Sequence, residues 1–263
     1  MDLHVEGKVF MVAASSKGLG FGIARELAVN GAVVCIASRT KNDIENAAEK
    51  LRAETSSTIY SSVADVSNAQ SIKSWVSEIT TAFKRIDGLV VNAGGPPPGK
   101  FDDFEDKDWE AAFNLTLMST VRLIRGVLPA MRNNGGGSIV TITSLSVKEP
   151  INQLLLSNVF RSGVTSLVKS LSNELASENI RVNNLFPGRI DTDRVKSLDK
   201  NLAVKEGTSA DAIKSTFEKT IPLGRYGTID EFGKAGAFLL SPAASYITGA
   251  SLAVDGGIIK TVW

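Results

Sequence analysis

Short apolar runs rich in β-branched residues alternate with longer segments of helical periodicity along the chain. The runs that predict strands lie at residues 8–14, 32–37, 58–63, 88–92, 137–143, 180–186 and 251–254. The segments that predict helices lie near residues 19–30, 41–54, 68–84, 106–132, 153–178 and 229–240. Strands of this buried type need cover on both sides, so we expect an α/β fold: a doubly wound parallel sheet of about seven strands with helices on both faces. Because no repeat or linker divides residues 1–263, they predict a single domain.

Composition excludes several functional classes. The chain is 43% hydrophobic and 22% charged, as is typical of a globular protein, and its net charge of +1 predicts no binding to nucleic acid or anionic membrane. No apolar segment approaches the ~20 residues that span a bilayer. The single cysteine, Cys35, cannot form an internal disulfide and is expected to be buried. One cysteine and one histidine, His4, predict no metal site, and the absence of a signal-like start predicts a cytoplasmic location.

The first predicted strand leads into a small glycine-bearing loop and then into a helix. This order, from Gly7 to Gly31, aims backbone N–H groups and a helix N-terminus at a phosphate. Gly18 and Gly20 lack the Cβ atoms that would hold a pyrophosphate away from the backbone. An ordinary strand-to-helix turn can have the same order, so further motifs are needed to identify a dinucleotide site.

Such motifs follow in order along the chain. They are Ala13-Ala14-Ser15-Ser16-Lys17-Gly18-Leu19-Gly20, Asp65-Val66, Asn92-Ala93-Gly94, Asn114, Ser144, Pro187-Gly188 with Ile190 and Thr192, and Val254-Asp255-Gly256-Gly257. In type, order and spacing they resemble the short-chain dehydrogenase/reductase family, in particular its 3-oxoacyl-carrier-protein reductase-like branch. The resemblance covers nearly the whole chain and implies a Rossmann-like fold.

The resemblance also implies a nicotinamide dinucleotide site. The positions that match the family's cofactor contacts are Ala14, Ser16, Lys17, Gly18, Leu19, Gly20, Ser38, Arg39, Asp65, Val66, Asn92, Ala93, Gly94, Arg161, Pro187, Gly188, Ile190 and Thr192. Among them Asp65 would face the adenine ring, and the Pro187–Thr192 segment would hold the nicotinamide carboxamide. Ala14 stands where the family has the first glycine of its phosphate loop. Its methyl group is compatible with binding provided that this position does not require a positive φ.

The residues after the second predicted strand indicate which dinucleotide is preferred. An acidic residue there accepts the ribose 2′-hydroxyl of NAD(H) and repels a 2′-phosphate. This chain has Ser38-Arg39-Thr40 instead, with no carboxylate before Asp43. Arg39 can offer a bidentate guanidinium to a phosphate, and Lys17 adds a second cation. The pair predicts NADP(H) over NAD(H), unless both are simply solvated surface cations.

The catalytic positions depart from the family pattern. Family reductases transfer a hydride to a carbonyl while a tyrosine donates the proton, and a lysine four residues later lowers the tyrosine pKa. Counting from Ser144, the tyrosine position holds Ser157 and the lysine position holds Arg161. The chain's tyrosines, Tyr60, Tyr226 and Tyr246, lie in other segments.

Several assignments of the proton donor stay open. Ser157 is a far weaker acid than a phenol, and Arg161 keeps its proton but can hold a ribose or phosphate-like group. Both can equally be polar residues of a disused site. Glu149, in the loop after Ser144, is an alternative acid, or else a solvated loop charge. The candidate catalytic residues are Asn114, Ser144, Ser157 and Arg161, with Ser144 bonding a substrate carbonyl and Asn114 ordering a water.

Two loops and the assembly complete the expectations. Residues 94–99, GGPPPG, predict a stiff loop beside the site, and residues 189–228 predict a lid insertion or a plain surface excursion. The resulting hypothesis is an NADP(H)-dependent oxidoreductase with an altered proton-transfer site that acts on a ketone or alcohol, a small-molecule substrate. The alternative is a catalytically weak dinucleotide-binding protein, acting as a sensor or structural partner. By resemblance we expect a homodimer or homotetramer, paired through helices 106–132 and 153–178 and the last helix and strand.

Overall fold

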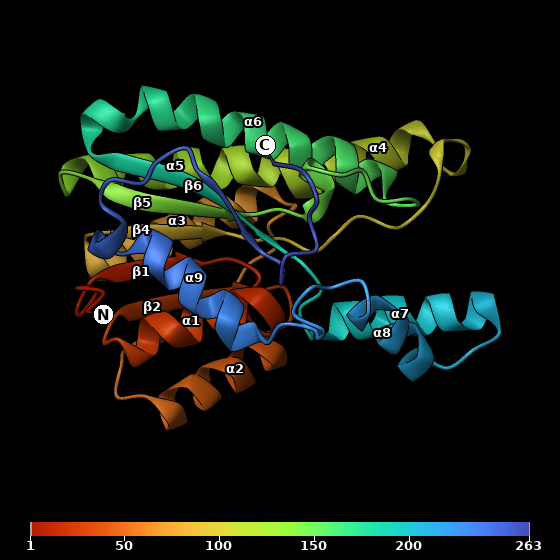
Figure 1. Cartoon of the computed structure of the whole chain (residues 1–263). Helices are drawn as coiled ribbons and strands as arrows, with labels where there is room; N and C mark the ends of the chain where they lie inside the picture. Colours follow the sequence, from red (N-terminus) through yellow and green to blue (C-terminus); the bar gives the residue numbers. More distant parts are fainter. Residues whose placement is uncertain (1, 263) are drawn as a thin grey trace.

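A computed structural model describes residues 2–262 and contains one seven-stranded parallel sheet with the order β3-β2-β1-β4-β5-β6-β7 (Figure 1). Every neighbouring pair of strands is parallel. The strands are β1 (Val9–Val12), β2 (Val33–Ser38), β3 (Ile59–Val63), β4 (Gly88–Val91), β5 (Gly137–Ile142), β6 (Ile180–Pro187) and β7 (Ser251–Val254). The predicted single-domain, doubly wound α/β fold is confirmed.

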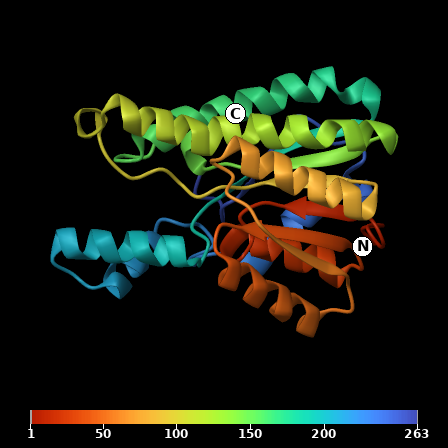
Figure 2. The same cartoon turned by 180° about the vertical axis from the view of Figure 1, so that it is seen from behind.

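Helices cover both faces of this sheet (Figures 1 and 2). They are α1 (Gly18–Val29), α2 (Lys41–Glu54), α3 (Ala69–Phe83), α4 (Asp106–Phe113), α5 (Ser119–Asn133), α6 (Leu155–Glu174), α7 (Asp193–Glu206), α8 (Ala210–Glu218) and α9 (Ile229–Leu240). One buried apolar cluster joins α1, α2 and α9 to the sheet, and a second joins α3, α5 and α6 to the opposite face. Among the described residues, no helix is both long and apolar enough to cross a membrane.

Close packing of α9 holds α1 in place. A Cβ atom on Gly233 of α9 would collide with the backbone oxygen of Gly22, and one on Gly22 would collide with the backbone oxygen of Ile229. Glycine is therefore required at both positions for the two helix backbones to approach so closely. This contact fixes the direction of α1, whose N-terminus faces the edge of the sheet where the strands end.

The predicted helix at residues 106–132 is interrupted. A π-helical turn at Asn114–Met118 separates α4 from α5. Side-chain hydrogen bonds to main-chain carbonyls flank this wider turn: Asn114 Nδ2 donates to Glu110 O at 3.0 Å, and Thr120 Oγ1 donates to Thr116 O at 2.8 Å. Helical periodicity does not distinguish a π-turn from an α-turn, and such turns often mark functional sites.

Residues 189–228 form an ordered helical pair in which sequence periodicity predicted no helix. In both views, α7 and α8 project beyond the sheet as a separate layer (Figures 1 and 2). Only Asp199 and Ala203 of α7 and Ile213 of α8 are buried, so these helices lack the wide apolar stripe that periodicity detects. Polar contacts hold the pair instead. Arg189 Nη1 lies 2.5 Å from Asp199 Oδ1, and Tyr226 donates its hydroxyl to Asp199 Oδ2 at 3.0 Å.

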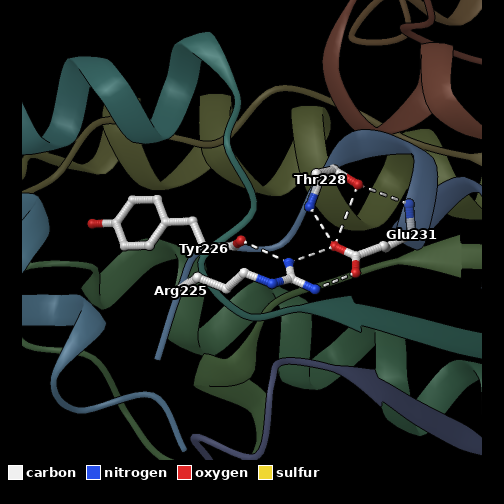
Figure 3. Close-up of polar contacts among 4 residues, drawn as sticks. All are labelled: Arg225, Tyr226, Thr228 and Glu231. Carbon is white, nitrogen blue, oxygen red and sulfur yellow. Dashed lines mark hydrogen bonds and ion pairs between the residues drawn. The ribbon is translucent and has the colours of Figure 1, made fainter. Parts of the chain in front are cut away.

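The chain returns from α8 to α9 through a compact polar cluster (Figure 3). Arg225 donates from both terminal nitrogens to the Glu231 carboxylate, at 2.9 and 2.6 Å. Glu231 Oε2 also accepts from Thr228 N at 2.8 Å, and Glu231 N donates to Thr228 Oγ1 at 3.2 Å, which forms a capping box at the start of α9. The ring of Tyr226 points away from this cluster, so adjacent residues anchor opposite sides of the segment.

Candidate active site

The loop after β1 contacts the end of β2 and the loop after β4, where the carboxyl ends of these strands meet. Ser15 is fully buried; its Oγ donates to Val12 O at 2.7 Å and accepts from Ala37 N at 3.2 Å. Asn92, just after β4, donates from Nδ2 to Ala14 O at 3.0 Å. The strand order reverses between β1 and β4, the switch point at which open α/β sheets place their ligands. The sequence did not single out Ser15 as a contact residue, since its role depends on the distant strand β2.

The two loop glycines serve different purposes. Gly18 has a φ of +63°, a backbone conformation that favours glycine, and a Cβ atom there would make only an ordinary contact with Thr192 Cγ2 at 3.8 Å. At Gly20, a Cβ atom would lie 2.9 Å from both Ala14 O and Asn92 Nδ2, so glycine is needed there for packing within the loop. At the start of α1, Lys17 provides no side-chain cap. A turn without a Cβ atom at Gly18, at an uncapped helix start, suits a phosphate group.

Ala14 occupies the left-handed region with a φ of +47°. Alanine was expected to be tolerated here only if the position did not require a positive φ. The loop does require one, so alanine is strained at this position. A non-glycine residue in this region costs on the order of 1–2 kcal/mol. The loop keeps its course because Asn92 holds the Ala14 carbonyl.

The segment after β6 faces this loop. Thr192 caps α7 by accepting from Val195 N, and its methyl carbon lies 3.8 Å from a Cβ position built on Gly18. Lys17 Nζ lies 3.5 Å from Asp193 Oδ2, with both side chains 70% exposed. The predicted Lys17 cation thus faces a carboxylate, which reduces the positive charge that it offers to a ligand.

The residues after β2 and β3 shape the other end of the site. Arg39 is exposed in the turn between β2 and α2, and Ser38 Oγ donates to Thr40 O at 3.2 Å. Asp65 accepts from Ser67 N at 2.9 Å, while Val66 is buried behind this turn. Arg39 forms no ion pair within residues 2–262, and its side chain is exposed to solvent beside this turn.

On α6, Ser157 and Arg161 share the face that meets the end of β5. Ser157 is 8% exposed. Arg161 Nη1 donates to Ile142 O at 2.8 Å and to Thr143 O at 3.3 Å. Burial, with the positive charge of Arg194, lowers the pKa of Arg161 to about 10. The guanidinium of Arg161 is thus attached to the end of β5.

Other predicted catalytic residues have partners of their own. Ser144 accepts from Ser146 N at 3.2 Å, and Asn114 accepts from Arg122 Nη2 at 3.1 Å. Glu149 accepts the backbone N–H of Lys260 at 3.1 Å, which attaches its loop to the C-terminal segment. Ser146 also carries a buried hydroxyl without a partner among the described residues, next to Ser144.

None of the tyrosines lies on α6. Tyr226 is buried between α7 and α8, where desolvation raises its pKa, and its hydroxyl is bonded to Asp199. Tyr60 stacks edge-on with Phe83 on the outer strand β3, and Tyr246 is fully exposed near the last strand. In residues 2–262, no group of three or more potential metal ligands is found.

The loop at residues 94–99 closes the side of the site next to α7. Gly99 N donates to Gln153 O at 2.6 Å, and Lys205 of α7 reaches Gln153 Oε1 at 3.1 Å. Arg194, in the first turn of α7, donates to Pro96 O at 3.4 Å. The three segments that leave β4, β5 and β6 therefore meet at one edge of the sheet.

A parallel sheet with a glycine-bearing loop at its switch point is the architecture of dinucleotide-binding α/β proteins. Residues 13–259 match the family model described as enoyl-(acyl carrier protein) reductase. The chain is 33% identical to the 3-oxoacyl-[acyl-carrier-protein] reductase FabG of Chlamydia muridarum, over 98% of this chain and 100% of that protein. The protein therefore belongs to the short-chain dehydrogenase/reductase family, in its FabG-like branch.

Solved structures agree with this placement. L-sorbose reductase from Gluconobacter frateurii, complexed with NADPH and L-sorbose, superimposes with a TM-score of 0.95 at 30% identity, covering 100% of both chains. A short-chain oxidoreductase from Pseudomonas aeruginosa, described as NADPH-bound and containing an atypical catalytic center, gives 0.87 at 26% identity, covering 97% of this chain and 98% of that one.

Proposed function

We propose that the protein is an NADP(H)-dependent oxidoreductase that interconverts a small ketone and its alcohol with an altered proton-transfer site. The observation that carries the proposal is the convergence of Gly18, Asn92 and Thr192, from the loops after β1, β4 and β6, at the switch point. Similarity to NADPH-complexed reductases supports the same cofactor class.

The residues present fit a nicotinamide dinucleotide. The backbone at Gly18, which carries no Cβ atom, and the uncapped start of α1 would take the pyrophosphate, and the Pro187–Thr192 segment would take the nicotinamide. Arg39 stands where a carboxylate would select NAD(H), so it supports a preference for the 2′-phosphate of NADP(H). The bound cofactor would supply the hydride.

The chain's own residues would position the carbonyl and its proton. Ser144 and Ser157 offer hydroxyls to the substrate oxygen, and Arg161 makes the local potential positive where negative charge develops. With a serine in place of the phenol, the proton would come from water or from Glu149. This division of roles predicts slower proton transfer than in a tyrosine-bearing relative.

The serine at position 157 also favours a second function. Because Ser157 lacks an acidic hydroxyl and Arg161 bonds main-chain carbonyls, the site can retain cofactor binding with little catalysis. The protein would then act as a dinucleotide sensor or a structural partner.

NADPH oxidation separates the two functions. Purified protein is assayed with a panel of ketones, β-ketoacyl thioesters and quinones, alongside Ser157→Ala and Glu149→Gln. Turnover that falls in one of these variants supports the oxidoreductase and identifies the proton path. Tight NADPH binding with no turnover of any carbonyl supports the alternative.

A titration tests the cofactor preference. NADPH and NADH affinities are compared in the unmutated protein, in Arg39→Ala and in the control Lys41→Ala, which removes an exposed cation from the start of α2. We expect Arg39→Ala alone to weaken NADPH binding selectively. Equal affinity for NADPH and NADH in the unmutated protein would contradict the preference.

We also infer a cytoplasmic homo-oligomer, a dimer or tetramer, whose residues 189–228 form a lid over the substrate. Apolar side chains stay exposed on the elements expected to pair: Phe113 at the end of α4 is 39% exposed, Val159 on α6 is 45% exposed and Leu252 on β7 is 37% exposed. Light scattering after size exclusion tests the assembly, and a monomer at micromolar concentration contradicts it.

A further inference from the structure

The first turn of α7 meets the loop after β1 at the edge of the sheet where the strands end. Lys17, just before α1, holds its Nζ 3.5 Å from Asp193 Oδ2. Next to this pair, a Cβ position on Gly18 lies 3.8 Å from the methyl carbon of Thr192, the residue that caps α7. A phosphate bound by the backbone at Gly18 would therefore meet both the lysine and the aspartate.

The ion pair between Lys17 and Asp193 is a loose one. Hydrogen bonds between an ammonium and a carboxylate are typically about 2.7–2.9 Å long, whereas these two groups are 3.5 Å apart. Both side chains are 70% exposed, so water screens their attraction. A pair of this kind is easily exchanged for a contact with another charged group.

Asp193 is held more firmly than Lys17. Its helix is anchored from within by the buried carboxylate of Asp199, which pairs with Arg189 and accepts the hydroxyl of Tyr226. The side chain of Lys17, in contrast, is a flexible stem that ends in a strongly hydrated charge. Lys17 can therefore change partners while α7 keeps its place.

We propose that Asp193 limits the affinity for the dinucleotide because it competes with one of the dinucleotide's phosphates for Lys17. The inference rests on the proposed function and names a residue that tunes its cofactor affinity. A phosphate and a carboxylate accept the same charge-assisted hydrogen bonds from a lysine, so both cannot use its full charge at once. The pyrophosphate and the 2′-phosphate of NADP(H) share this chemistry, and a comparison of NADPH with NADH distinguishes them.

A double-mutant cycle tests the competition. The affinities for NADPH and NADH are measured by nucleotide fluorescence with the full-length protein, with Asp193→Asn, with Lys17→Gln and with both changes together. Asp106→Asn is the matched control, because Asp106 is an exposed carboxylate at the first residue of α4, as Asp193 is at the first residue of α7.

We expect Asp193→Asn to tighten NADPH binding about two- to fivefold, the range that corresponds to an exposed ion pair, and Asp106→Asn to leave it unchanged. In Lys17→Gln, the gain from Asp193→Asn should disappear. A gain for NADPH alone supports a contact with the 2′-phosphate, and an equal gain for NADH supports one with the pyrophosphate. No gain in Asp193→Asn, or a gain of the same size in both backgrounds, overturns the competition.

Hydrogen exchange separates competition from a loosened helix. Because Asp199 anchors α7, exchange of the α7 amides beyond the first turn should stay within about twofold in Asp193→Asn. Faster exchange along the whole of α7 would attribute the change in affinity to the helix and overturn the proposal.

Failure of the oxidoreductase proposal is distinguishable from failure of this one. Affinities that follow the cycle without turnover of any carbonyl contradict the oxidoreductase and support the competition. Carbonyl-dependent NADPH oxidation with equal NADPH affinity in Asp193→Asn and the unmutated protein does the reverse. If no variant binds either dinucleotide, both proposals are wrong.

Discussion

Arg189 and Asp199 form a buried ion pair, 2.5 Å between Nη1 and Oδ1, that joins the segment after β6 to the middle of α7. The Asp199 side chain is only 6% exposed, its second oxygen accepts from Tyr226, and Arg189 stacks 3.3 Å from the ring centre of Phe217 on α8. One carboxylate therefore holds together three parts of the 189–228 segment.

Replacing Asp199 by alanine leaves the Arg189 charge buried without a partner. We expect the free energy of opening of α7 and α8 to fall by about 3 kcal/mol, the cost of breaking a buried pair. Hydrogen exchange of the α7 amides measures this opening. Asn201→Ala, an exposed change on the same helix, should stay within about 0.5 kcal/mol. Unchanged α7 exchange in Asp199→Ala would show that apolar contacts hold the segment.

Replacing Ala14 by glycine removes the strain of a positive φ. We expect the free energy of unfolding, measured by urea denaturation, to rise by about 1 kcal/mol. The same chemical change at Ala53, exposed in the last turn of α2, should lower it by about 0.5 kcal/mol because glycine is a poor helix former. A loss of stability in Ala14→Gly would contradict the left-handed conformation at this residue.

The Arg225–Glu231 contact makes stability depend on acid pH (Figure 3). Hydrogen bonds from Arg225, and then from the Thr228 backbone, lower the pKa of Glu231 to about 2. The carboxylate therefore contributes fully above its unfolded pKa of about 4.3, and its contribution is lost as pH falls through about 2.

In Glu231→Gln we expect less than about 1 kcal/mol of destabilisation at neutral pH, because the side chain is 43% exposed and screened by solvent. Urea denaturation between about pH 5 and 2 should show a shallower acid dependence for this variant. Glu45→Gln, at an exposed partner of Lys41, is the matched control. Parallel pH profiles for Glu231→Gln and the unmutated protein would disprove the contribution.

Restoring the family's acid pair tests how much of the site is intact. We expect Ser157→Tyr with Arg161→Lys to raise carbonyl-dependent NADPH oxidation by about a hundredfold, since a positioned general acid contributes at least this much. Ser162→Tyr adds a phenol to an exposed position of the same helix and should have no effect. No gain in the double variant would mean that other parts of the site have also diverged.

Much of the fold was predictable because its signals are local. Each strand was expected within two residues of its observed ends, and β7 was predicted at its full range, 251–254, since buried parallel strands are short apolar runs bounded by turns. Helices α7 and α8 were missed because a buried ion pair and a tyrosine hydrogen bond stabilise them in place of an apolar stripe. The π-turn at Asn114 was missed because it continues the helical pattern.

The sequence by itself determined the order of the strands and the family. These follow from residue types at fixed spacing. Only the tertiary structure decided that Ala14 adopts a positive φ, that Arg161 bonds the end of β5, and that Arg194 reaches Pro96 from α7. The reason is physical: backbone strain, hydrogen bonding and repulsion between charges depend on groups brought together from distant parts of the chain.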